Sequence, residues 1–262
     1  MTKKEIYAKY GIEFKDGKIN HPVLGWVRLP IVNGNAKIGK GCWHFSTLPT
    51  NKPYTVKING IEYHILGTCP LHCKGCYATS GNYRFQSCVN ALGMRTWLVQ
   101  NDVDFLERAI MAQIEADKIA VLRIHAAGDF FSWAYVQMWQ RIARKNPAVI
   151  MWTYTKKEQA EKAFDDIENV NIVKSIIKGY GFNFGHCDYV METYKALKEN
   201  GENVYICKCG TDKQQHCINC GACRTNKYVL FIEHSTEYKA EKDPLYSTLK
   251  ALIESQKDIE LR

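Results

Sequence analysis

Three cysteines stand close together at Cys69, Cys73 and Cys76, in the stretch TCPLHCKGCYATSGNYRF. A structural zinc site takes four nitrogen or sulfur ligands in a tetrahedron, and a cubane iron–sulfur cluster also takes four, usually all cysteine. This loop offers three thiols and no local fourth ligand. His72 lies within the loop, but it is adjacent to Cys73 and is expected to point away from it. A cluster held by three cysteines leaves one iron open, so the spacing favours a centre that binds a further molecule. A zinc site is the alternative.

A second group of cysteines lies in CKCGTDKQQHCINCGAC, residues 207–223. Its last three members have the C-x2-C-x2-C spacing of a bacterial ferredoxin segment: Cys217, Cys220 and Cys223. This spacing is crowded for zinc, whose usual pattern separates two pairs of ligands by a longer spacer. We therefore predict an auxiliary [4Fe–4S] cluster here, with a structural zinc site as the alternative.

Two cysteines compete for the fourth position in this second group. Cys207 and Cys209 are separated by one residue, so strand alternation sends both to the same side and does not distinguish them. We choose Cys209, because Gly210 after it permits the tight turn that a ligand loop requires. His216 is a further nitrogen donor, although a histidine beside a ligand is more often a solvated loop residue.

The cysteine content as a whole indicates metal sites and not disulfide bonds. The chain has 262 residues and 11 cysteines, and its 46% hydrophobic and 24% charged residues are ordinary for a globular protein. The N-terminus, MTKKEIYAKY, lacks the apolar centre of a signal peptide, and no apolar run is long enough to span a membrane. We therefore expect a cytoplasmic protein with no membrane partner, in a compartment where disulfides rarely persist.

The net charge of +8 allows an anionic partner. The lysines are spread along the chain and do not form one basic arm, which is more typical of a solvated basic surface. The charge therefore permits a nucleic acid, a nucleotide or a peptide as substrate and selects none of them.

The elements that position the cysteines alternate between strand and helix after residue 60. Apolar residues recur with a helical period between 102 and 118, and Ser132 is placed to cap a helix that begins at Trp133. Strands are expected at residues 61–67, 119–128, 148–155, 170–179, 203–208 and 227–234. Helices are expected at residues 102–118, 133–146, 156–167, 186–200 and 244–260.

Strands that are mostly followed by helices indicate an α/β fold with a parallel sheet. We expect a partial (β/α)6 barrel, with an open doubly wound sheet as the alternative. Both architectures bind ligands at the carboxyl ends of the strands, and both cysteine groups follow predicted strands. The predicted parts are an irregular N-terminal loop and hairpin extension, 1–58; a β/α core, 59–206; a cysteine-rich metal-binding insertion, 207–226; and the last strand and C-terminal helix of the core, 227–262.

The first cysteine group also has the context of a known superfamily. C-x3-C-x2-C followed by an aromatic residue, here Tyr77, after the first strand of a β/α chain resembles the radical S-adenosylmethionine superfamily. The resemblance implies that Cys69, Cys73 and Cys76 hold a catalytic [4Fe–4S] cluster whose open iron chelates S-adenosylmethionine, and that Tyr77 packs near the adenine. One electron from flavodoxin or ferredoxin would then give methionine and a 5′-deoxyadenosyl radical that abstracts hydrogen from a substrate.

A second point of resemblance follows the next predicted strand. The superfamily commonly has a Gly-Gly-Glu turn there that receives the amino group of S-adenosylmethionine, and HAAGDFFS places Gly128 and Asp129 at that point. The match is partial, because Ala127 replaces the first glycine and aspartate replaces glutamate. Contacts to the ribose and the carboxylate are left open among residues near strand ends: Arg123, His125, Thr155 and Lys156.

The chain is also similar to small phage-associated members of the superfamily, which have CYA after the cluster loop and a late cysteine group. The function that the resemblance implies is that of a radical S-adenosylmethionine enzyme with an unidentified substrate. The alternative is a non-catalytic, zinc-stapled nucleic-acid-binding protein. That alternative explains the cysteines and the charge, but it does not explain a loop with three thiols.

Overall fold

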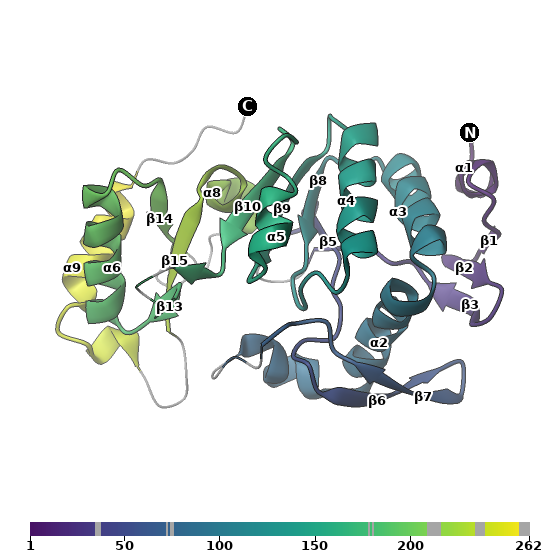
Figure 1. Ribbon diagram of the computed structural model, residues 1–262, viewed down its shortest axis with the longest axis horizontal. Coiled ribbons are helices and arrows are strands. Elements are labelled where there is room, and N and C mark those ends of the chain that lie inside the picture. The colour runs from purple at the N-terminus through teal and green to yellow at the C-terminus, as the bar shows by residue number, and fades with distance from the viewer. Residues whose placement is uncertain are drawn as a thin grey trace.

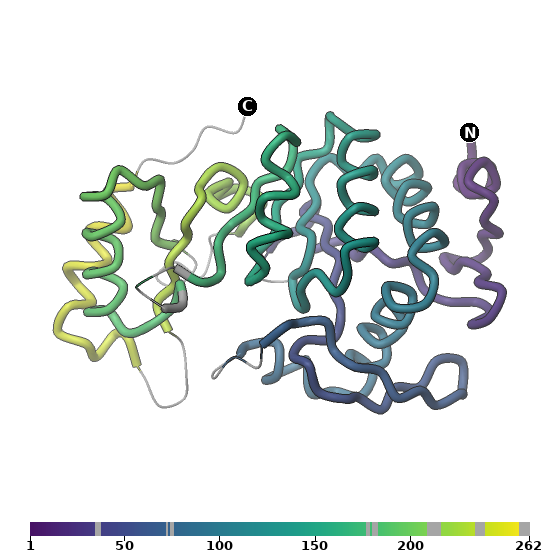
Figure 2. The backbone as a smooth tube through the Cα atoms, in the orientation of Figure 1, coloured from purple at the N-terminus to yellow at the C-terminus, as the bar shows by residue number. Residues whose placement is uncertain are grey.

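The computed structural model describes residues 1–34, 38–71, 73, 76–177, 179, 181–208, 216–233 and 239–256. The chain has a mixed α/β fold with several small sheets (Figure 1). Figure 2 shows the purple N-terminal segment and the yellow C-terminal helix at opposite ends of the long axis. Among the described residues, no helix is both long and apolar enough to cross a membrane.

The largest sheet lies in the middle of the molecule. In spatial order it consists of β10 (Val170–Lys174), β9 (Ile150–Thr155), β8 (Val121–Ile124), β5 (Trp43–His44) and β4 (Val32–Asn33). The edge strand β4 is antiparallel to β5, and every other neighbouring pair in this sheet is parallel. The connections between its parallel strands include the helices α2 (Gln86–Asn101), α3 (Val103–Asp117), α4 (Trp133–Lys145) and the short α5 (Glu158–Lys162) (Figure 1).

Two of these helices, α3 and α4, begin with a capping side chain. The Asp102 carboxylate accepts a hydrogen bond from the Phe105 N–H at 3.0 Å, and the Ser132 hydroxyl accepts one from the Tyr135 N–H at 3.3 Å. Helix α3 buries its apolar side in the main hydrophobic core, and α4 does the same. The helices expected at 102–118 and 133–146 are therefore confirmed.

The strand expected at 61–67 forms, but it does not belong to the largest sheet. Residues Ile61–Leu66 make β7, which pairs antiparallel with β6 (Pro53–Ile58) in a separate hairpin. Asn59 and Gly60 have positive φ angles of 50° and 86°, and this conformation makes the two-residue turn between the strands. The expected boundary at residue 58 therefore falls inside a hairpin.

Strand β5 takes the place of the first parallel strand, at residues expected to lie in the N-terminal extension. Its pairing with the β8 segment continues beyond the strand, because the Thr47 N–H donates to the Ala127 carbonyl at 3.0 Å. After the hairpin the chain returns to the same edge, where the Thr68 N–H donates to the Leu48 carbonyl at 2.9 Å. The first cysteine loop therefore follows β7 in the chain but lies beside the carboxyl end of the first parallel strand.

Helix α2 (Gln86–Asn101) is not predicted from the sequence. It packs against both the β6–β7 hairpin and α3, so its apolar residues cover more than one face and the helical period is weak. Its contact with β6 is close, because a Cβ atom on Gly93 would lie 2.4 Å from Val56 Cγ1. The segment before α2 contains two 3-10 helices, η1 (Tyr77–Thr79) and η2 (Gly81–Arg84).

The N-terminal residues form a helix and a small sheet. Helix α1 (Lys3–Lys9) packs against α3. The antiparallel sheet that follows consists of β1 (Phe14–Lys15), β2 (Lys18–His21) and β3 (Gly25–Arg28). The Gln113 side chain on α3 fixes the next segment, because its Oε1 accepts from the Ile31 N–H at 2.9 Å and its Nε2 donates to the Ile31 carbonyl at 2.8 Å.

A second, smaller hydrophobic core lies at the opposite end of the molecule. Its parallel sheet has the order β13 (Phe184–Gly185), β15 (Tyr228–Ile232) and β14 (Val204–Ile206). Helices α6 (Cys187–Glu199) and α9 (Tyr246–Ser255) pack on it (Figure 1). The remaining elements here are the hairpin β11 (Ile176–Ile177) with β12 (Gly181–Phe182), the short helices α7 (Cys217–Cys220) and α8 (Ala222–Thr225), and η4 (Ala240–Lys242).

The two sheets meet at β10, because the Lys174 N–H donates to the Lys227 carbonyl at 3.0 Å, at the start of β15. The first four parallel strands follow the chain order, whereas β15, the last strand of the chain, lies between β13 and β14. The inserted segment with α7 and α8 returns to contact β9 and β10. The second cysteine group is thereby brought to the face of the largest sheet.

We predict that Gln113→Leu lowers the free energy of unfolding by about 2–4 kcal/mol, because it leaves the buried backbone N–H and carbonyl of Ile31 without partners. Denaturant titration measures the change. The matched control is Gln159→Leu on α5, where the side chain is exposed, and a change within about 0.5 kcal/mol is expected. Equal losses in the two variants would contradict the role assigned to Gln113.

Candidate metal centres

The first thiol loop is held at both ends by backbone hydrogen bonds. The Cys69 N–H donates to the Thr50 carbonyl at 3.2 Å, and the Cys76 N–H donates to the Cys73 carbonyl at 3.3 Å. All three cysteines of the loop are half-buried and free of disulfides. Burial, with the negative charge of Asp129 nearby, raises the pKa of the Cys69 thiol to about 12. The loop therefore presents three reduced thiols at the sheet edge.

The Gly128–Asp129 turn lies directly beside this loop. The Thr47 and Thr68 hydroxyls are hydrogen-bonded at 2.7 Å, and Thr68 Oγ1 also accepts from the Asp129 N–H at 3.0 Å. Gly128 has a φ of +90°, and a Cβ atom there would lie 1.8 Å from Thr47 Oγ1. Only glycine satisfies both the conformation and the close approach. The structure thus brings together the two segments that the sequence singled out.

The Asp129 carboxylate is buried and joins the ends of two strands. Its Oδ1 accepts from Thr155 Oγ1 at 2.8 Å, and its Oδ2 accepts from the Lys156 N–H at 3.0 Å. Burial raises the pKa of Asp129, and these hydrogen bonds oppose that rise. Thr155 and the Lys156 backbone are therefore engaged with Asp129, which leaves acceptor capacity on the carboxylate.

Tyr77 and Arg123 connect the first thiol loop to the sheet. The Tyr77 hydroxyl donates to the Ala126 carbonyl, although its side chain is 56% exposed overall. Arg123 Nη2 lies 3.4 Å from the same hydroxyl, and the guanidinium lies 5.1 Å from the centroid of the Tyr154 ring. Arg123 therefore lies between two tyrosines on the inner face of the sheet, the face opposite the α3 and α4 packing.

His125 has a packing role instead. It is buried with a φ of +60°, and its Nε2 lies 2.8 Å from the Tyr135 hydroxyl, while its Nδ1 lies 3.3 Å from Thr153 Oγ1. Burial lowers the pKa of His125 to about 3, so the imidazole is neutral at ordinary pH. Four residues near strand ends were candidates for contacts to the ribose and the carboxylate. Of these, His125 packs in the hydrophobic core and does not face the site.

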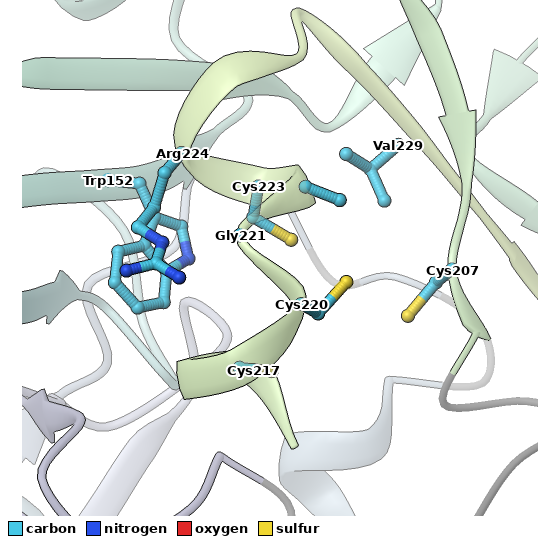
Figure 3. Close-up of a pocket in the computed structure, with 9 residues that line it drawn as sticks. Trp152, Cys207, Cys217, Cys220, Gly221, Cys223, Arg224 and Val229 are labelled. Atoms are coloured by element: carbon cyan, nitrogen blue, oxygen red, sulfur yellow. The ribbon is translucent and has the colours of Figure 1, made fainter. Parts of the chain in front are cut away.

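The second group of thiols lines a pocket between the two sheets (Figure 3). The space between these residues is narrow, and about 310 Å³ is free of atoms when the adjoining open solvent is counted. In Figure 3 the sulfur atoms of Cys207, Cys220 and Cys223 point into the same space. The residues around it are Trp152, Cys207, Cys217, Cys220, Gly221, Ala222, Cys223, Arg224 and Val229. The expected ligand Cys209 lies outside the described residues, and Cys207 supplies a thiol to this pocket.

Two distant segments fix the pocket in place. Asn171 Nδ2 on β10 donates to the Cys223 carbonyl at 2.9 Å. The Ile218 N–H donates to the Ile38 carbonyl at 3.1 Å, and a Cβ atom on Gly39 would lie 2.7 Å from Ile218 Cγ2. The early segment around residue 39 is therefore packed tightly against α7.

Cys42 lies in that early segment, and sequence spacing gives no signal that it belongs near the second group. It is fully buried with Ile38 and Trp152, and Cys217 packs against this small cluster. Burial, followed by the effect of Cys217, raises the pKa of Cys42 to about 12. Only the fold brings this thiol beside the pocket.

The two thiol groups are linked by side chains across the inner face. The Tyr154 hydroxyl lies 2.7 Å from Cys223 Sγ, and its ring stacks with the Arg123 guanidinium, which in turn reaches Tyr77 next to Cys76. Within the described part of the chain, no three His, Cys, Asp or Glu side chains are grouped so as to hold a single metal ion.

Comparison with known proteins gives one family. The family model described as "Gene product 88" matches residues 30–227. The Gene 88 protein of Mycobacterium phage L5 is 25% identical over 189 residues, which are 60% of this chain and 77% of that protein. The Gene 88 protein of Mycobacterium phage D29 is 25% identical over 190 residues, with the same two shares of 60% and 77%. No solved structure matches significantly.

We predict that Gly128→Ala lowers the free energy of unfolding by about 2–5 kcal/mol, because the new Cβ meets Thr47 in a conformation that disfavours alanine. Thermal and denaturant unfolding measure the loss. Gly60→Ala is the matched control, since Gly60 also has positive φ but has open space around it. Its expected cost is about 1–2 kcal/mol. If Gly128→Ala loses no more free energy of unfolding than Gly60→Ala, the close approach of Gly128 to Thr47 is contradicted.

Proposed function

The chain belongs to the Gene product 88 family, and we propose that it is a radical S-adenosylmethionine enzyme with an auxiliary iron–sulfur cluster. Support comes from the edge of the largest sheet. The first thiol loop lies beside the carboxyl end of the β5 segment, and the Gly128–Asp129 turn follows the neighbouring β8 segment. Thr68 bonds to that turn, so thiols and turn share the edge where β/α folds bind ligands.

The order of the first four parallel strands also supports the incomplete β/α barrel as the architecture of this enzyme. Strands β5, β8, β9 and β10 are adjacent in chain order, as in such a barrel. In the second sheet β15 lies between β13 and β14, which is not chain order. The proposed barrel is therefore limited to the part of the molecule that contains the largest sheet.

When bound, a [4Fe–4S] cluster with S-adenosylmethionine would supply a 5′-deoxyadenosyl radical after receiving one electron from flavodoxin or ferredoxin. Cys69, Cys73 and Cys76 are the protein ligands in this proposal, and they leave one coordination position for the sulfonium compound. The Tyr77 hydroxyl bonds to the Ala126 carbonyl and so holds its ring at the end of β8.

Asp129 has two tasks in the proposed enzyme. Its hydrogen bonds to Thr155 and Lys156 hold the ends of β8 and β9 together. Its remaining acceptor capacity suits an ammonium group such as the amino group of S-adenosylmethionine. The buried position strengthens that interaction, because water does not compete for the carboxylate.

For the second site we propose an auxiliary [4Fe–4S] cluster held by Cys217, Cys220 and Cys223, with Cys207 as fourth ligand. The donor set supports this proposal, since these thiols surround one pocket beside β14 and β15. Zinc is the alternative occupant. A cytoplasmic location is part of the same proposal, because a reducing compartment keeps such thiols available for metal.

We predict that protein purified without oxygen is brown and holds about eight irons and eight sulfides per chain. With S-adenosylmethionine and dithionite it should form 5′-deoxyadenosine. Cys73→Ala should abolish that product and retain about four irons, because the second site is left intact. The control is Cys88→Ala, at a half-buried cysteine outside both groups, which should keep all the iron.

Colourless protein that contains zinc would overturn the proposed enzyme. It would favour the zinc-stapled nucleic-acid-binding protein instead. Brown protein that forms no 5′-deoxyadenosine with any reductant would likewise reject radical chemistry while retaining the clusters.

We predict that Cys207→Ala loses about half of the bound iron, whereas Cys209→Ala retains it, because Cys207 contributes its thiol to the pocket. Iron and sulfide analysis of the anaerobic proteins, with electron paramagnetic resonance after reduction, measures both. The reverse pattern would restore Cys209 as the fourth ligand.

A further inference from the structure

Arg95 on α2 is a cation buried inside the protein. Its side chain is 6% exposed, and its Nε is buried with no hydrogen-bond partner. Among the residues that the structure describes, no carboxylate forms an ion pair with it. Charged side chains are almost never buried unless they are paired. A buried guanidinium to which the described residues offer no carboxylate therefore requires an explanation outside the stability of the fold.

Two further basic side chains lie on the adjacent strands β8 and β5. Arg123 and His44 lie side by side, because they are register partners on the parallel strands β8 and β5. The Arg123 Nε is also buried without a hydrogen-bond partner. Burial, followed by the charges of Arg95 and Arg123, lowers the pKa of His44 to about 4. Burial lowers the pKa of Arg95 to about 10, and the side chains that then act on it most strongly are Cys88, Arg28 and Tyr83, none of which is a carboxylate.

Two tyrosines border this group on the side of the first thiol loop. The Tyr77 and Tyr83 rings lie 6.0 Å apart, edge to face. Tyr77 contacts Arg123 through its hydroxyl, and Tyr83 interacts electrostatically with both Arg95 and Arg123. The group of basic side chains is therefore adjacent to the loop that carries Cys76.

We propose that Arg95 and Arg123, with His44, bind an oxyanion of the substrate, either a carboxylate or a phosphate group. This inference rests on the proposed function and names the substrate class for that site. Two guanidinium groups match the charge and the hydrogen-bond acceptors of an oxyanion. A bound anion supplies the missing partner of Arg95, and the net charge of +8 favours the approach of an anionic substrate.

The position of the group separates this anion from the edge that would hold S-adenosylmethionine. Arg123 and His44 lie within strands β8 and β5, whereas the Gly128–Asp129 turn follows the end of the β8 segment. The oxyanion would therefore anchor the substrate deeper on the inner face. The reacting part of the substrate could then extend toward the thiol loop.

The first test measures anion binding to the cluster-loaded protein without oxygen. Thermal unfolding is followed against inorganic phosphate and, separately, acetate, with sodium chloride at matched ionic strength as the reference. A saturable rise of about 3–6 °C at ten times the dissociation constant is expected with one of the two anions. Phosphate alone would indicate a phosphorylated substrate, and acetate alone a carboxylate. No saturable shift with either anion would overturn the proposal.

Substitution of Arg95 gives a sharper result. Arg95→Met should remove the anion-dependent shift and should raise the unfolding temperature in the absence of anion, because it deletes an unpaired buried charge. Arg95→Lys should retain a weakened shift. The matched control is Arg141→Met. Arg141 lies on α4, away from the site, and its guanidinium pairs with Glu107 on α3 at 2.6 Å. It should leave the shift unchanged. Loss of stability in Arg95→Met, with the shift retained, would show that Arg95 is structural and overturn the proposal.

A final measurement shows whether the bound oxyanion belongs to the substrate or to S-adenosylmethionine. Equilibrium dialysis with S-adenosylmethionine compares wild type with Arg95→Met, and equal affinities are expected. Loss of that affinity in the variant would assign the oxyanion to S-adenosylmethionine itself and overturn the substrate assignment. The proposed function fails separately, when 5′-deoxyadenosine is absent. If the protein binds the anion but forms no 5′-deoxyadenosine, the anion site stands and the proposed enzyme is rejected. If it forms 5′-deoxyadenosine but binds no anion, the enzyme stands and the anion site is rejected.

Discussion

A single buried carboxylate organises the edge of the largest sheet. Asp129 receives hydrogen bonds from Thr155 and Lys156, while its own N–H bonds to Thr68 at the start of the thiol loop. Three segments that are remote in sequence are thus held by one residue. The interaction is strong because the carboxylate is buried with several donors and is not exposed to water. The glycine before it is required for the same reason, since any side chain there would separate the segments.

The inner face of this sheet is unusual in its chemistry. Its outer face packs apolar side chains against helices, as a globular core requires. The inner face instead carries His44, Arg123 and Tyr154, and the two thiol groups lie against it from different directions. Such polar side chains stabilise a fold poorly, so the stability of the sheet alone does not account for their presence there.

Much of the fold was predictable from local signals, and each exception has a physical cause. The helix after Asp102 and the cap at Ser132 follow from periodicity and capping chemistry, which act over a few residues. The identity of the first parallel strand does not, because β5 has only two residues and a hairpin separates it from its loop. Helix α2 was missed because it is apolar on more than one side.

In the site, spacing identified both cysteine groups, but distance along the chain carries no information about Arg95 or Cys42. The close contact between Gly39 and Ile218 has a further consequence for how the molecule assembles. Loop closure over so long a stretch is slow and costs entropy, so the second thiol pocket must form late, after the central sheet exists. On the ribosome, the first cysteine loop and its contacts through Asp129 and Lys156 are all synthesised before residue 217, so that edge of the sheet can assemble while α7 and α8 are still being made.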